Sequence, residues 1–257
     1  MLPHETITAV INSAKEAKGI ALIPFITAGY PDKENFVETL SLISQVGDVV
    51  EIGVPFSDPM ADGMTIQRSS YKAIQAGVTL QWIFEQLNLI KDRISAPLVM
   101  MSYLNPLLAF GFDALAERAV ETGVCAFIVP DLPLEESIEL STSLDRKGIG
   151  LIQLVTPITP KKRLIRLCKA SKGFVYAVTI TGITGGDHGH SDDLISYLDR
   201  VMTVSEIPVC AGFGIRTAED VNTIKQHATG AIVGSALVEV LERDDDPEEF
   251  LRSIRIT

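Results

Sequence analysis

Cysteines, long apolar runs and secretory features are all scarce in this chain of 257 residues. Its three cysteines, Cys125, Cys168 and Cys210, are scattered without CxxC spacing, which excludes a disulfide framework and indicates a reduced, intracellular chain. No apolar run approaches the roughly 20 residues that cross a membrane, and the N-terminus lacks the pattern of a secretory signal. We therefore expect a cytoplasmic protein without membrane association.

Positive charge is also limited. The chain has 22 Lys and Arg against 33 Asp and Glu, a formal net charge of -11, and no run rich in basic residues. Nucleic-acid binding gains its affinity from a basic face that neutralises phosphates, so we expect no nucleic-acid partner. A small anionic ligand would have to be held locally, against an unfavourable overall field.

The sequence does contain eight short apolar runs rich in β-branched and aromatic residues, with helical segments between them. The runs are nearly continuous, which is typical of parallel strands buried on both faces. They predict a (β/α)8 TIM barrel, α/β in class, with residues 1–257 as a single domain and residues 1–18 as an extra helix over its bottom. A doubly wound open sheet is the alternative, but it usually has fewer strands and a GxGxxG turn, which residues 27–31 lack. The predicted strands are residues 21–27, 49–54, 97–103, 126–130, 150–156, 174–179, 208–213 and 230–234.

Helix starts and one long insertion are also marked. The Pro-Asp pair at residues 31–32 predicts a helix start after the first strand. Thr217, with acidic residues at 219 and 220, predicts the N-cap of the helix after the seventh strand. Residues 55–96 exceed what one loop and one helix need, so we expect an extended functional loop there.

One carboxylate stands inside a predicted strand. Glu51 has Val49, Val50 and Ile52 as apolar neighbours. A carboxylate in such surroundings is costly to bury in its charged form, so we expect a raised pKa, which suits a group that both donates and accepts protons near neutrality. The alternative is a structural glutamate paired with a Lys or Arg of a neighbouring strand, although the predicted strands contain almost none.

Two further carboxylates follow in the loop at residues 56–63, with the sequence FSDPMADG. A loop rich in turn-forming residues can fold Asp58 or Asp62 back over the mouth of a barrel. A solvated loop closed by a local Asp turn is an equal alternative.

Glycines mark the ends of the last three predicted strands, at residues 181–186, 211–215 and 233–236. Glycine lets backbone N–H groups approach an anion closely, and the helix expected after Ser235 adds unsatisfied donors. Because the loops after the seventh and eighth strands usually hold phosphate in this fold, we expect a phosphorylated ligand.

Other candidates carry less weight. Asp187, His188 and His190 match neither a zinc motif nor an i, i+4 pair, so we interpret them as part of a polar loop and predict no metal site. Tyr103 and Tyr176, which end two predicted strands, either face the cavity or are core tyrosines with satisfied hydroxyl groups.

Residues 50–63 (VEIGVPFSDPMADG) resemble the signature of the tryptophan synthase alpha chain family. Further similar blocks in family order extend the resemblance over essentially the whole chain: residues 24–29, 101–106, 130–136, 182–185 and 212–215. The resemblance implies a lyase of tryptophan biosynthesis that cleaves indole-3-glycerol phosphate by a retro-aldol reaction to indole and glyceraldehyde 3-phosphate. It also implies no cofactor in this chain and a partner, the pyridoxal-phosphate-using beta subunit, in an alpha2-beta2 complex.

The resemblance assigns roles to residues of this chain. It implies Glu51 as the general acid and base, Asp62 as the carboxylate beside the indole nitrogen, and Tyr176 as a cavity tyrosine. Residues 57–59 and the surroundings of Asn105 resemble segments that face the beta subunit. We expect apolar or aromatic walls for indole at Phe25, Ile66, Tyr103 and Phe213, and a phosphate site at Gly185, Gly214, Gly234 and Ser235.

Three features depart from the family pattern: Met64 stands where the family usually has proline, Ile180 stands where some members have arginine, and residues 186–190 are unusual for the loop after the sixth strand. We expect a looser Asp62 loop and altered loop closure. These departures motivate an alternative, a barrel that binds the phosphate ligand and activates a beta subunit without catalysis of its own. A third hypothesis is another phosphate-binding barrel enzyme, such as a sugar-phosphate isomerase, which would need no aromatic pocket.

Overall fold

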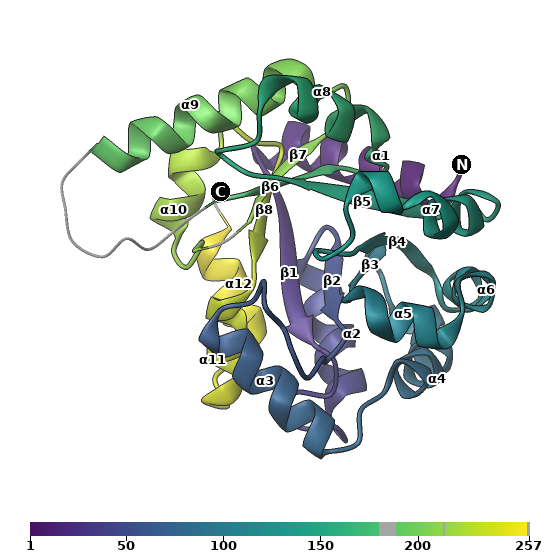
Figure 1. Ribbon diagram of the computed structural model, residues 1–257. Helices are drawn as coiled ribbons and strands as arrows, with labels where there is room; N and C mark the ends of the chain where they lie inside the picture. Colours follow the sequence, from purple (N-terminus) through teal and green to yellow (C-terminus); the bar gives the residue numbers. More distant parts are fainter. Residues whose placement is uncertain (180–188, 213, 256–257) are drawn as a thin grey trace.

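Eight parallel strands form a closed barrel in the computed structural model, which describes residues 1–179, 189–212 and 214–255 (Figure 1). Each strand pairs with its neighbours in sequence order, and β1 pairs with β8 to close the ring. The predicted TIM barrel is confirmed, although the fourth strand begins at Val124 rather than at residue 126. The strands are β1 (Ala21–Thr27), β2 (Val50–Gly53), β3 (Leu98–Met101), β4 (Val124–Ile128), β5 (Gly150–Val155), β6 (Val175–Val178), β7 (Val209–Gly212) and β8 (Gly230–Val233).

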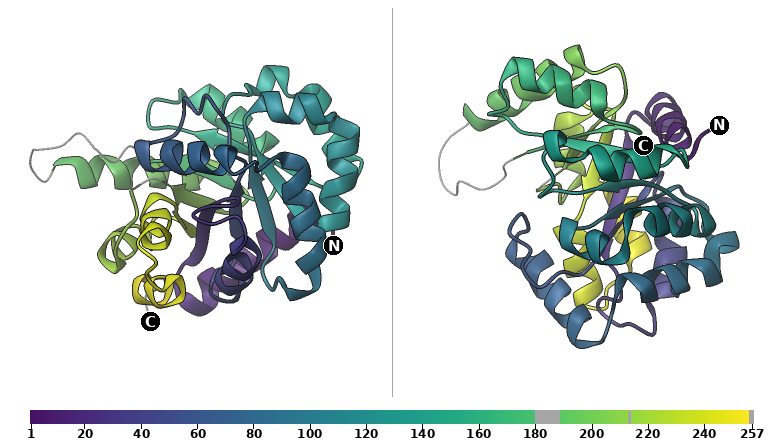
Figure 2. Two further views of the ribbon diagram at one scale, coloured as in Figure 1. Left: turned by 90° about the horizontal axis from the view of Figure 1, so that it is seen from below. Right: turned by 45° about the vertical axis from the view of Figure 1, so that its right-hand side comes forward.

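Helices surround the strands in every view (Figures 1 and 2). Within the described residues, none of them combines the length and apolar character that a membrane span requires. They are α2 (Phe36–Val46), α3 (Met64–Gln75), α4 (Leu80–Ile90), α5 (Leu104–Phe110), α6 (Phe112–Thr122), α7 (Ile138–Asp145), α8 (Lys161–Ala170), α9 (Gly189–Val204), α10 (Ala218–Ile224), α11 (Ser235–Glu242) and α12 (Pro247–Ile254), with short 3-10 helices at Lys91–Arg93 and Leu134–Glu136.

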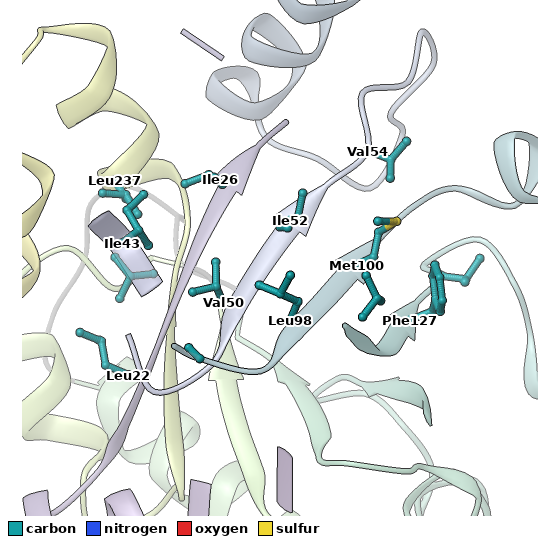
Figure 3. Close-up of a cluster of buried hydrophobic side chains, with 14 of the residues drawn as sticks. Leu22, Ile26, Ile43, Val50, Ile52, Val54, Leu98, Met100, Phe127 and Leu237 are labelled. Atoms are coloured by element: carbon teal, nitrogen blue, oxygen red, sulfur yellow. The ribbon is translucent and has the colours of Figure 1, made fainter. Parts of the chain in front are cut away.

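Apolar side chains fill the layer between strands and helices. Val50 and Ile52 of β2 pack in one buried cluster with Ile43 of α2 and Leu237 of α11 (Figure 3). Because successive side chains of a strand point to opposite faces, the residue between Val50 and Ile52 points into the barrel. That residue is Glu51, so the packing of the outer layer directs the carboxylate inward.

An additional helix, α1 (Pro3–Lys18), closes the N-terminal end of the barrel. Ile7 and Ile11 are fully buried in the same cluster as the inward-facing side chains of the strands. The hydroxyl of Thr8 donates a hydrogen bond to the carbonyl oxygen of Gly173, 2.7 Å away, just before β6. The predicted extra helix at the bottom is therefore confirmed, and the opposite end of the barrel is left for a site.

The helix after β1 begins at Phe36, so the prediction of a start at residues 31–32 was wrong. The carboxylate of Asp32 accepts hydrogen bonds from the backbone N–H of Glu34 at 3.0 Å and from the side chain of Asn35 at 2.8 Å. An aspartate that bonds to its own chain two residues on stabilises a turn, which competes with helix formation. The expected N-cap at Thr217 is confirmed, since its hydroxyl accepts from the N–H of Asp220 at 3.2 Å.

The long segment between β2 and β3 contains more helix than expected. An irregular loop follows β2 and ends where α3 begins at Met64, and α4 fills much of the remainder. The extended loop was correctly predicted, but the second helix was missed. This arrangement brings Asp62 to the C-terminal mouth of the barrel, two residues before a helix.

Candidate active site

A cavity of about 380 Å³ opens at the C-terminal ends of the strands, where TIM barrels hold their active sites. Glu51 and Asp62 both line it, together with apolar residues from β1, β3, β6 and β8. Its lining residues are Phe25, Glu51, Asp62, Gly63, Ile66, Met101, Tyr176, Gly214, Ile215, Arg216, Ile232, Gly234, Ser235 and Ala236.

Glu51 is the most buried of the polar residues that line this cavity. Its side chain is about 1% exposed, and its Oε2 has no hydrogen-bond partner among the described residues. Burial, and secondarily the charge of Asp62, raises the pKa of Glu51 to about 8. The expected rise in pKa is therefore present, and no basic side chain of the described chain forms an ion pair with Glu51.

Asp62 is held at the rim by the loop that follows β2. The phenol of Tyr103 donates a hydrogen bond to its Oδ2 at 3.2 Å and accepts one from the N–H of Ala61 at 2.8 Å. The side chain of Gln67 donates to the carbonyl oxygen of Asp62 at 2.8 Å. Burial raises the pKa of Asp62 to about 6, and the hydrogen bond from Tyr103 opposes that rise.

The two carboxyl groups thus favour different protonation states near neutral pH. With pKa values of about 8 and about 6, Glu51 is mostly protonated and Asp62 mostly ionised. Pairs of titratable groups whose surroundings separate their pKa values are suited to acid–base chemistry. The cavity can therefore supply a proton from Glu51 and stabilise a positive charge with Asp62.

Aromatic and apolar side chains form the wall beside the carboxylates. Phe25 and Tyr176 reach across neighbouring strands at glycines: a methyl group at Gly53 would collide with the Phe25 ring, and one at Gly212 with the Tyr176 ring. Phe25, Ile66 and Tyr176 line the cavity as expected, and Met101 joins them. This wall is suited to a flat apolar ring.

Tyr103 does not line this cavity directly. It stands behind Asp62, stacks on Phe56 with ring centroids 4.9 Å apart, and borders a small neighbouring recess. Its position is therefore that of a hydrogen-bond donor to Asp62 rather than of a wall. Phe213, the remaining expected wall residue, lies outside the described residues.

The opposite end of the cavity is built from glycines and a helix start. Gly214 has a φ of +81°, a conformation that favours glycine, and it follows β7. Gly234 is the N-cap of α11, which begins at Ser235, and as a glycine it has no side chain that could cap this end. The first N–H groups of a helix lack partners within the helix and attract anions. Three of the four predicted phosphate residues therefore lie together, and Gly185 is outside the described residues.

Sequence reasoning missed Arg216, two residues beyond Gly214. It lines the cavity, and its guanidinium donates a hydrogen bond to Glu239 of α11. Because Arg216 follows the glycines at the end of a predicted strand, its position in the sequence could have indicated that it lies at the cavity. Met64, the departure from the family pattern, begins α3 with its side chain exposed.

A second cavity of about 340 Å³ lies between the loop after β4 and α8. Its acidic residue, Asp131, already accepts a hydrogen bond from the N–H of Leu104 at 2.9 Å, and Arg163 is paired with Glu135. It contains none of the predicted residues. Among the described residues, no group of three or more His, Cys, Asp and Glu side chains is arranged to hold a metal ion.

Comparison with known proteins gives matches over nearly the whole chain. The family model described as "Tryptophan synthase alpha chain" matches residues 11–256. The tryptophan synthase alpha chain of Bacillus cereus (strain AH820) is 41% identical over 254 residues, which are 98% of this chain and 97% of that protein. The crystal structure of the tryptophan synthase alpha subunit from Legionella pneumophila str. Paris has a TM-score of 0.86 at 30% identity, over 99% of this chain and 97% of that one. A structure of Mycobacterium tuberculosis tryptophan synthase has a TM-score of 0.87 at 32% identity, over 98% of both chains.

Proposed function

This chain belongs to the tryptophan synthase alpha chain family, and we infer that Glu51 and Asp62 carry the lyase reaction of that family. The reaction cleaves indole-3-glycerol phosphate to indole and glyceraldehyde 3-phosphate, a step of tryptophan biosynthesis. The observation that carries the assignment of residues is the buried carboxyl group of Glu51, whose Oε2 has no hydrogen-bond partner among the described residues, in a cavity that Asp62 also lines.

Glu51 transfers protons in both directions. In its protonated form it donates a proton to C3 of the indole ring, which makes the ring system cationic. The resulting carboxylate then removes the proton from the glycerol hydroxyl next to the ring. The bond between C3 and the glycerol carbon breaks, its electron pair returns to the ring, and an aldehyde forms. Glu51 ends protonated, so protons balance, and its raised pKa suits both transfers.

Asp62 stabilises the intermediate between these transfers. A positive charge develops on the ring nitrogen when C3 is protonated, and an ionised carboxylate beside that N–H lowers its energy. Tyr103 keeps Asp62 oriented through the hydrogen bond to Oδ2. Phe25, Ile66 and Tyr176 supply the apolar wall for the ring, and the N–H groups that begin α11 at Ser235 face the phosphate.

An indole assay tests this proposal. The isolated chain is incubated with indole-3-glycerol phosphate, with and without a beta subunit, and indole is measured. We expect indole in both mixtures. Binding of the ligand without indole in either mixture would favour the alternative of a non-catalytic activator. Failure to bind any indole compound would favour a different phosphate-binding barrel.

We propose that the partner is a beta subunit, in an alpha2-beta2 complex, bound at the rim formed by the loops after β2, β3 and β5. Large apolar side chains are exposed on this rim: Met60 after β2, Leu108 on α5 and Ile158 after β5. Exposed apolar residues that gather on one face mark interaction surfaces. The rim also includes residues 57–59 and Asn105, where the family resemblance places the interface.

Charge substitution on the rim tests the docking site. We expect Met60→Asp and Ile158→Asp to weaken binding of a beta subunit by about 10-fold or more, measured by calorimetric titration. Leu89→Asp is the matched control, since Leu89 is equally apolar and exposed but stands at the end of α4 remote from the rim. Equal effects of all three substitutions would contradict this docking site.

The cellular location is also a proposal. All three cysteines are unpaired, which supports a reducing compartment and agrees with the expected cytoplasmic location.

A further inference from the structure

Arg216 is the one Lys or Arg among the described residues that line the cavity, and two carboxylates, Glu51 and Asp62, line it as well. The substrate of the proposed function carries a phosphate of nearly two negative charges at neutral pH. The whole chain has a formal net charge of -11, so such a ligand enters an unfavourable field. A cation close to the bound phosphate would offset this negative potential at the phosphate itself.

The backbone of Arg216 is fixed in place. Its N–H donates to Oδ2 of Asp220 at 2.9 Å, and the same oxygen accepts from the N–H of Thr217 at 2.9 Å. Asp220 and Thr217 form the capping box of α10. The side chain of Arg216 therefore starts from a rigid base, two residues after Gly214.

The guanidinium of Arg216 is held beside α11 by Glu239. One carboxylate oxygen of Glu239 accepts from Nη2 of Arg216, and the other accepts from the hydroxyl of Thr65 at 3.1 Å. Glu239 stands four residues after Ser235, so both lie on the same face of α11. Thr65 precedes the cavity residue Ile66, and α3 and α11 lie side by side (Figure 1). The guanidinium thus lies beside the cavity, near the start of α3 and the second turn of α11.

Most of the hydrogen-bonding capacity of this guanidinium is unused. A guanidinium has five N–H donors, and within the described residues only the bond to Glu239 engages them. The side chain is about half exposed, so its free donors are accessible to a ligand. We propose that Arg216 binds the phosphate group of the substrate through these donors, with Glu239 as the residue that positions it. This inference rests on the proposed function and adds a charged side chain to a phosphate site otherwise made of backbone N–H groups.

Calorimetric titration with glycerol 3-phosphate tests the inference without requiring catalysis. We expect Arg216→Gln to weaken binding by about 10- to 100-fold, the usual size of a lost hydrogen bond to a charged group. Arg216→Lys should give an intermediate loss, because lysine keeps the charge but not the planar fork. The matched control is Arg252→Gln, which removes an exposed arginine paired with Glu248 on α12 and should bind like wild type. Binding by Arg216→Gln within about twofold of that control would overturn the inference.

Kinetics separate a binding role from a structural one. The kcat/KM of Arg216→Gln should fall for indole-3-glycerol phosphate and stay unchanged for the same compound without its phosphate. An equal fall for both compounds would contradict the assignment. If wild type forms no indole while glycerol 3-phosphate binding still depends on Arg216, the proposed function fails and this inference stands.

The positioning role of Glu239 has its own readout. We expect Glu239→Gln to weaken glycerol 3-phosphate binding less than Arg216→Gln does, and the double variant to bind like Arg216→Gln alone. Residues that act through one another show such non-additive effects. Additive losses in the double variant would show that Glu239 does not act through Arg216.

Discussion

Glu51 and Asp62 face the same cavity, but a strand holds one and a loop holds the other. The side chain of Glu51 is locked inward by the alternation of β2 and is almost fully buried. Asp62 is only partly buried and depends on a hydrogen bond from Tyr103. Desolvation therefore raises the pKa of Glu51 further than that of Asp62, to about 8 against about 6. Two residues with the same functional group acquire opposite protonation states because different elements carry them.

Removing the buried carboxyl group gives the largest expected effect. Glu51→Gln preserves size and polarity but can neither donate nor accept the proton. We expect indole formation to fall by about 10²–10⁴-fold, the usual contribution of a general acid–base group. Steady-state measurement of indole release checks this, with glycerol 3-phosphate binding as the control for an intact site. Near-normal turnover would show that Glu51 is not the proton-transfer group.

The loop carboxylate should matter less. Asp62→Asn removes the charge beside the ring nitrogen but leaves proton transfer in place, so we expect kcat to fall by about 10–10²-fold. The charge of Asp62 also raises the pKa of Glu51, so its removal should shift the alkaline limb of the pH–rate profile to lower pH. A pH–rate profile of both proteins measures this shift. An alkaline limb that stays in place would show that the two carboxyl groups do not interact.

Glu51 should also affect stability: the Glu51→Gln substitution that lowers activity should make the folded protein more stable at high pH. Its folded-state pKa of about 8 exceeds its ordinary value of 4.5, so the folded protein retains a proton that the unfolded chain releases. The free energy of unfolding of the wild type therefore decreases progressively, through the titration of Glu51, as pH rises from about 4.5 through about 8. Glutamine does not titrate, so the Tm of Glu51→Gln relative to wild type should rise by about 7–14 °C between about pH 5 and about pH 8.

Thermal unfolding of the wild type and of Glu51→Gln between about pH 5 and about pH 8 measures this change in the Tm difference. Glu239→Gln serves as a contrast, because the hydrogen bond from Arg216 lowers the pKa of Glu239 and its loss should not become stabilising at high pH. A constant Tm difference between wild type and Glu51→Gln would contradict a raised pKa at Glu51.

The same contrast between strand and loop decides what could be predicted from sequence. Glu51 was recognisable because its strand and its apolar neighbours are adjacent in the chain, and alternation alone fixes its direction. The bond between Tyr103 and Asp62 joins residues 41 apart, and that between Arg216 and Glu239 joins residues 23 apart. Their side chains meet only after the barrel has closed, so no local pattern indicates the pairing. The misplaced helix start at residues 31–32 has a different cause, since the Asp32 side chain favoured a turn that competes with the helix.

The smallest expected effect comes from removing the hydrogen bond that Tyr103 donates to Asp62. Tyr103→Phe removes the hydrogen bond that opposes the rise in the pKa of Asp62, so that pKa should move above its present value of about 6 by about 0.5–1 unit. Asp62 would then be protonated over more of the acidic range, and the acidic limb of kcat/KM should shift to higher pH by the same amount. Activity should fall about 1.5- to 3-fold near pH 6.5 and remain close to wild type near pH 8, because Asp62 is ionised there in both proteins. Tyr71→Phe, at an exposed tyrosine of α3, is the matched control and should leave the profile unchanged. A loss of equal size at every pH would mean that Tyr103 holds the position of the loop through the N–H of Ala61, and that the charge of Asp62 is set by burial alone.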